Sequence, residues 1–129
     1  MAARAETAVD LHHRVLLGLL KAVEAQLGPG GDRAESARTL ARLLDFTRLH
    51  FEAEELVMGL HGYPQAAAHG EAHRGLLAEA EGLREAHGQG DGPGARRTVE
   101  RLRSWLLDHL RGHDQDFADW CDRNGIRPD

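Results

Sequence analysis

Glycine and proline clusters divide the chain into four long segments. The clusters read GPGG (28–31), GLHGYP (59–64), GQGDGPG (88–94) and NGIRPD (124–129). Between them, apolar residues recur every three or four positions, which is the period of an amphipathic α-helix, and no segment alternates as a strand does. The pattern predicts helices over residues 6–27, 32–59, 64–87 and 93–122. Long helices joined by short loops form an antiparallel up-down four-helix bundle, so we expect an all-α fold.

Length and charge narrow the class of protein. The chain has 129 residues, which predicts a single domain over 1–129 on the usual prior of ~100–200 residues each. Its 16 basic residues are dispersed and its formal net charge is −5, so we expect no nucleic-acid partner. No apolar run approaches the ~20 residues of a membrane span, and the start MAARAETAVD lacks the apolar core of a signal peptide. The single Cys121 excludes an internal disulfide, and we expect a cytoplasmic protein.

Histidine is unusually frequent, with nine residues in a short chain. Each predicted helix carries at least one potential metal ligand on its apolar stripe. His50 and Glu54 are four residues apart on the second helix, as are His69 and His73 on the third. The first and last helices contribute His13 and His109. Such groups are costly in an apolar core unless they meet each other or a metal, so the pattern predicts a metal site inside the bundle.

The donor set favours iron among the common metals. Five imidazoles and a carboxylate exceed the four ligands of structural zinc, and the mixture excludes an all-oxygen calcium site. No cysteine lies among the donors, which excludes an iron–sulfur cluster. Imidazole and carboxylate together suit iron, and the excess of ligands indicates two ions bridged by carboxylates. On the last helix, periodicity pairs His109 with His113, because Asp114 is rotated ~140° from His109.

Four stretches of the chain resemble the hemerythrin family of non-haem diiron proteins. They are VDLHHRVL (9–16), HFEAEELVM (50–58), GYPQAAAHGEAH (62–73) and WLLDHLRGHD (105–114). The resemblance implies seven ligands, with Asp114 in place of His113. One iron would take His69, His73 and His109, and the other His13 and His50. Both would share Glu54, Asp114 and a solvent-derived oxo or hydroxo bridge, and Asp114 would reach its place through a local distortion of the helix.

By this resemblance the expected function is reversible binding of dioxygen, for storage, delivery or sensing, by a protein that is not an enzyme. Two alternatives stay open: a diiron enzyme that reduces peroxide or nitric oxide, and an iron- or oxygen-responsive regulatory module. The sequence names no protein partner. Apolar residues expected around the oxygen are Phe51, Met58, Leu76, Trp105, Leu106 and Leu110. We expect His113 and His61 to lie behind the ligands or at the surface, and His12 and His87 at the surface.

Overall fold

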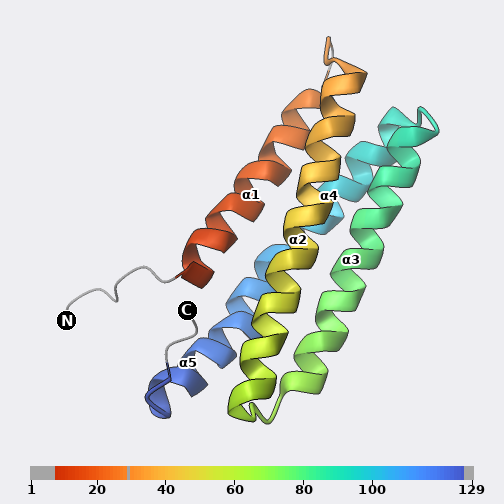
Figure 1. Ribbon diagram of the computed structural model, residues 1–129. Helices are drawn as coiled ribbons and strands as arrows, with labels where there is room; N and C mark the ends of the chain where they lie inside the picture. The colour runs from red at the N-terminus through yellow and green to blue at the C-terminus, as the bar shows by residue number, and fades with distance from the viewer. Residues whose placement is uncertain (1–7, 29, 127–129) are drawn as a thin grey trace.

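The computed structural model describes residues 8–28 and 30–126, and within these ranges every regular element is helical. The predicted helix start at residue 6 and the predicted domain ends therefore lie outside the described residues. The elements are α1 (Ala8–Gln26), α2 (Arg33–His61), α3 (Ala66–Gly88), α4 (Gly92–His109), the π-helix η1 (Leu110–Asp114) and α5 (Gln115–Arg123). Since α4, η1 and α5 follow one another without a break, they form the fourth long rod of a four-helix bundle (Figure 1).

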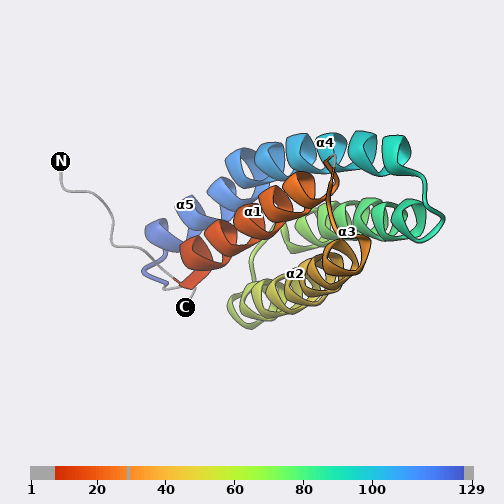
Figure 2. The ribbon, with the colours of Figure 1, turned by 90° about the horizontal axis from the view of Figure 1, so that it is seen from above.

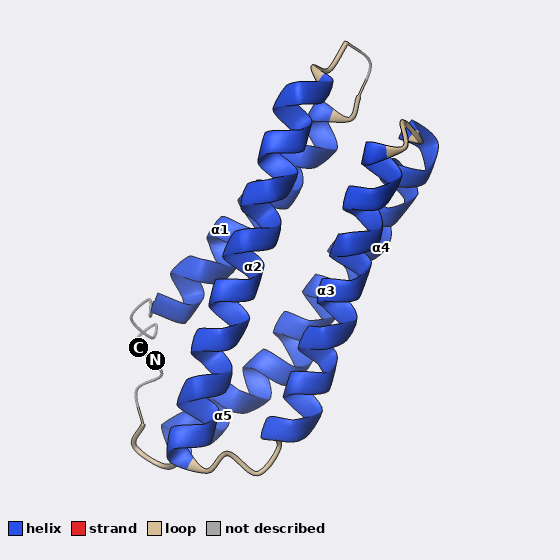
Figure 3. Ribbon diagram, turned by 45° about the vertical axis from the view of Figure 1, so that its right-hand side comes forward, coloured by secondary structure: helices blue, strands red, loops and turns tan. Residues whose placement is uncertain are grey.

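The helices pack in the cyclic order expected of an up-down bundle. Contacts join α1 to α2, α2 to α3, α3 to α4, and α4 back to α1. Seen from above, the rods run side by side along one long axis (Figure 2). Loops occupy only the two ends of the bundle, so the middle is built from helix alone (Figure 3). The predicted fold class is confirmed, and none of the described helices has the length and apolarity that a bilayer crossing requires.

Both ends of α2 are set by local chemistry. The Asp32 side chain caps its start and accepts hydrogen bonds from the backbone N–H groups of Ala34 (2.8 Å) and Glu35 (3.3 Å). The helix ends at His61, two residues later than predicted, because Gly59 stays helical and Gly62 is the first residue to turn left-handed, with φ of 68°. The N–H of Tyr63 then donates to the Met58 carbonyl at 2.9 Å and closes the cap.

Apolar side chains form two clusters inside the bundle. The larger one takes Leu16, Leu20 and Val23 from α1 and continues along the other helices to Phe51, Leu76 and Leu106. The smaller one, near the α2–α3 turn, contains Met58, Tyr63, Phe117 and Cys121. Between them on α2, α3 and the fourth rod lie the buried imidazole and carboxylate side chains, namely His50, Glu54, His69, His73, His109 and Asp114. The fold thus encloses a polar layer between two apolar ones.

Candidate metal centre

The polar layer consists of two overlapping groups of possible ligand atoms. One group contains Glu54, His69, His73, His109 and Asp114, and the other contains His13, His50 and Glu54. Within each group the ligand atoms lie within 4.8 Å of one another. The structure therefore brings together all seven residues that the resemblance implied, from all four rods of the bundle. Six of the seven side chains are buried, and His13, near the start of α1, is half-buried.

Glu54 faces both groups of histidines, one with each carboxylate oxygen. Its Oε1 lies 2.7 Å from Nε2 of His69 and 3.5 Å from Nε2 of His73. Its Oε2 lies 3.2 Å from Nε2 of His50, which is one helical turn away on α2. The carboxylate thus stands between the two groups with its oxygens divided between them.

Asp114 divides its oxygens in the same way. Oδ1 lies 2.8 Å from Nε2 of His69 and 3.1 Å from Nε2 of His109. Oδ2 lies 3.0 Å from Nε2 of His13. Two carboxylates that each offer one oxygen to a three-histidine group and one to a two-histidine group have the donor arrangement of bridging ligands between two cations.

The π-helix explains how Asp114 enters the cluster. In an α-helix, residues five apart point in different directions, whereas the wider π turn closes i to i+5. The π segment covers Leu110–Asp114, the five residues that follow His109. As a result Asp114 is buried and His113 only half-buried. The α-helical periodicity that paired His109 with His113 was wrong at this point, and the local distortion implied by the resemblance is present.

Many of the clustered polar atoms are buried without a hydrogen-bond partner. They include Nε2 of each of the five histidines and both oxygens of Glu54. The facing nitrogens and oxygens are only 2.7–3.5 Å apart, yet these contacts lack the angles of a hydrogen bond. An unsatisfied buried polar atom costs about 1–3 kcal/mol, so a cluster of this kind fits a cation that the facing nitrogens and oxygens would bind.

Electrostatics inside the cluster favour charged carboxylates. Burial alone would raise the pKa of Glu54, but its contacts with three histidines outweigh burial and lower this pKa to about 2. Burial opposes ionisation of Asp114 as well, and its contacts with His109, His13 and His69 hold its pKa well below the usual range. Burial would lower the pKa of His69, whereas the two carboxylates raise it to about 9. The two ionised carboxylates thus place negative charge where a cation would bind, in competition with the proton of His69.

Further residues hold two of the histidines from behind. Nδ1 of His50 lies 3.0 Å from Nδ1 of His12, and Nδ1 of His73 lies 3.4 Å from Oε2 of Glu55. Phe51 stacks on His73, with ring centroids 3.8 Å apart and planes 2° apart. The expectation that His12 lies at the surface is wrong, because its ring is half-buried against His50. Sequence reasoning missed both roles; the glutamate pair in HFEAEE was the available signal for Glu55.

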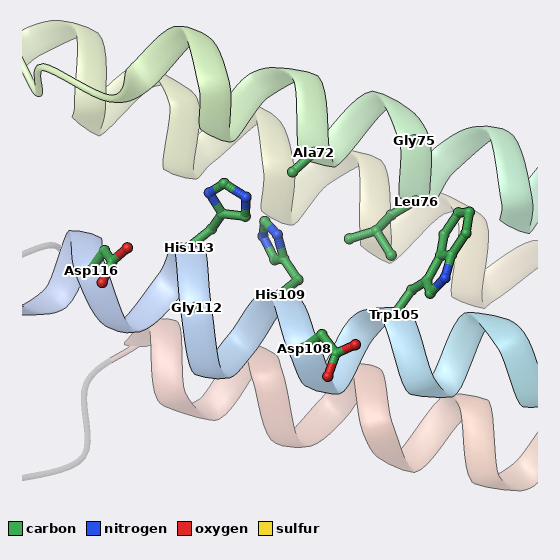
Figure 4. Close-up of a pocket in the computed structure, with 9 residues that line it drawn as sticks. All are labelled: Ala72, Gly75, Leu76, Trp105, Asp108, His109, Gly112, His113 and Asp116. Atoms are coloured by element: carbon green, nitrogen blue, oxygen red, sulfur yellow. The ribbon is translucent and has the colours of Figure 1, made fainter.

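A pocket of about 520 Å³ opens between α3 and the fourth rod, beside the cluster (Figure 4). Leu76 and the indole of Trp105 form its apolar side, and the rings of His109 and His113 form the side nearest the cluster. Trp105, expected near the oxygen, is 46 % exposed and lines this outer pocket. The ring of His113 lies 5.4 Å from that of His109 and 5.5 Å from that of His69.

The other residues singled out from the sequence lie in the two apolar clusters, at the surface or at the other end of the bundle. Phe51 and Leu106 are buried in the larger apolar cluster and Leu110 packs against it, whereas Met58 belongs to the smaller one. His61 is exposed in the last turn of α2. His87, expected at the surface, is half-buried at the other end of the bundle, where its Nε2 lies 2.7 Å from Oγ of Ser36.

Comparisons with known proteins point to one family. The family model described as "Hemerythrin HHE cation binding domain" matches residues 4–121. A bacteriohemerythrin of Stenotrophomonas maltophilia is 33 % identical over 113 residues, which cover 86 % of this chain and 71 % of that protein. A hemerythrin-like protein of Naegleria gruberi is 29 % identical over 105 residues, covering 81 % and 76 %.

A solved structure extends the likeness to three dimensions. A crystal structure of wild-type hemerythrin superposes with a TM-score of 0.75 at 25 % identity, over 90 % of this chain and 95 % of that one. The order of the helices and the buried His/Glu/Asp cluster point the same way as the sequence matches. This chain belongs to the hemerythrin family.

Proposed function

We propose that the cluster holds two iron ions and that the protein binds dioxygen reversibly, for storage, delivery or sensing. The observation that carries the proposal is the division of each carboxylate between the two histidine groups. Glu54 and Asp114 each direct one oxygen to the three-histidine group and the other to the two-histidine group. A single cation among the three histidines would leave one oxygen of each carboxylate, and the imidazoles of His13 and His50, with no cation to bind.

In this proposal the seven side chains have distinct tasks. His69, His73 and His109 would hold one ion, His13 and His50 would hold the other, and Glu54 and Asp114 would offer an oxygen to each. A solvent-derived oxo or hydroxo group would be the third bridge. Mixed imidazole and carboxylate ligation suits iron, and the family binds dioxygen. When bound, the iron pair supplies reversible electron transfer to and from dioxygen.

The residues of the chain make the two proposed metal positions unequal and limit their contact with water. Three histidines would hold one ion and only two would hold the other, so a small molecule would be received on the side of His13 and His50, where fewer side chains offer a nitrogen. The apolar clusters on both sides of the polar layer limit the access of water to it. Exclusion of water and anions protects a reversible binder from irreversible oxidation.

Metal analysis combined with optical spectroscopy tests the proposal. Protein purified and reduced without oxygen should contain two irons per chain, and its spectrum should change on exposure to oxygen and revert when oxygen is removed. One zinc per chain and no iron would contradict the diiron centre. Immediate irreversible oxidation with peroxide- or nitric-oxide-dependent turnover would instead support the enzyme alternative, which the open pocket beside His109 and His113 favours.

A further inference from the structure

His12 is the neighbour of the candidate ligand His13 in the sequence, but its side chain contacts a different candidate ligand, His50. Its ring does not enter the polar layer but lies behind His50, with the two Nδ1 atoms 3.0 Å apart. The rings meet edge to face, with centroids 5.1 Å apart and an interplanar angle of 86°. Phe46 contacts the same ring edge to face at 5.4 Å, so His12 is held in place between α1 and α2.

Only one hydrogen can lie between the two Nδ1 atoms, and the tautomers of the two imidazoles decide which nitrogen carries it. A neutral imidazole has one nitrogen that donates and one that accepts. Nε2 of His50 faces Glu54 inside the cluster and must present a lone pair there if it is to bind a cation. Its Nδ1 must then carry the hydrogen and donate it, which leaves Nδ1 of His12 as the acceptor and Nε2 of His12 as the protonated nitrogen.

We propose that His12 is a positioning residue that fixes the ring orientation and the tautomer of His50, and so controls occupancy of the two-histidine metal position. This inference rests on the proposed function. Metal-bound histidines generally donate their second N–H to a carboxylate, carbonyl or water, and loss of such a partner typically costs 10- to 100-fold in metal affinity. The acceptor behind His73 is the Glu55 carboxylate, whereas the acceptor behind His50 is a neutral imidazole.

The first test is a titration of the metal-free full chain with Co²⁺ in competition with a chelator. The two-histidine group has fewer nitrogens and should fill second. His12→Leu should weaken the second step about 10- to 100-fold and change the first step less than about 2-fold, whereas His12→Gln, which keeps an acceptor, should recover part of the loss. His87→Leu is the matched control, because it removes a half-buried, hydrogen-bonded histidine far from the cluster.

A second measurement separates positioning from packing. In the Zn²⁺-loaded wild-type chain, ¹⁵N NMR of the imidazoles should find the proton on Nδ1 of His50 and on Nε2 of His12. A proton on Nδ1 of His12 would overturn the inference even if His12→Leu failed to fold. Unchanged second-step affinity in a folded His12→Leu variant would overturn it as well. If the second step is unchanged in His12→Leu and the wild type binds two Co²⁺ ions, the role of His12 is contradicted and the diiron proposal stands. If the wild type binds fewer than two Co²⁺ ions, the diiron centre and the role of His12 are contradicted together.

Discussion

His109 and Asp114 are five residues apart, yet Nε2 of His109 lies 3.1 Å from Oδ1 of Asp114. This contact depends on the π turn of Leu110–Asp114, which adds one residue to the last helix. The same extra residue sets the rotation of α5, where Phe117 and Cys121 point into the smaller apolar cluster. One local feature of the backbone thus positions both a carboxylate of the site and the apolar layer beneath it.

Inserting one alanine after Gly112 would give this segment a second extra residue, which a single π turn does not absorb. Asp114 would then lie six residues after His109 and rotate away from His109 and His13, so the metal content should fall well below two per chain. Phe117 would leave its cluster as well, so the variant should unfold at lower denaturant concentration. The matched control is Gly112→Ala, since a Cβ at this position meets nothing within 4 Å and the π turn is kept. Full metal content after the insertion would show that the direction of Asp114 set by the π turn is not required.

Glu54→Gln should also lower the metal content well below two irons per chain. The substitution keeps the size of the side chain but removes the charge that both histidine groups face. Glu52→Gln on the same helix is the control, because Glu52 is exposed and lies outside the cluster. Iron analysis of both purified variants makes the comparison, and equal iron in the two would argue against a bridging role for Glu54.

The contrast between Glu54 and Asp114 shows what the sequence could predict and why. Helix number and the clustering of the histidines follow from a regular period, so the spacing from His50 to Glu54 was readable directly. The spacing from His109 to Asp114 was not, because nothing in LRGHD by itself distinguishes a π turn from an α turn, and only the resemblance selected Asp114. His12 was missed for another reason: its contact with His50 joins two helices, and such tertiary contacts leave no periodic signal within either one.

Phe51→Ala should lower the free energy of unfolding by about 3–5 kcal/mol, the usual cost of removing a buried aromatic side chain. Phe51 is 2 % exposed and stacks on His73. Trp105→Ala should cost far less, because the indole is 46 % exposed and lines the outer pocket. Urea denaturation of both metal-free variants measures the difference. A larger loss for Trp105→Ala would show that the indole packs more closely in solution than in this structure.

The stability of the metal-free protein should depend on pH in two opposite ways. The pKa of Glu54 is depressed from 4.5 to about 2, so its ionised form stabilises the fold above pH 4.5, and this contribution is lost as the pH falls toward 2. The pKa of His69 is raised from 6.5 to about 9, so its protonated form stabilises the fold below pH 6.5, and this contribution is lost as the pH rises through 9. Unfolding free energy measured in urea with a chelator present should therefore be greatest between these limits.

His69→Gln isolates the alkaline limb of that profile. Without the imidazole there is no proton to lose between pH 6.5 and 9, so the decline over this range should become shallower, while the contacts of Glu54 with His50 and His73 retain a reduced acid limb. Metal affinity of the wild type should change in the opposite direction to the stability of the metal-free chain. A cation displaces the proton of His69, so binding strengthens as the pH rises toward 9. A metal affinity that is constant from pH 6.5 to 9 would mean that His69 carries no proton before the metal binds.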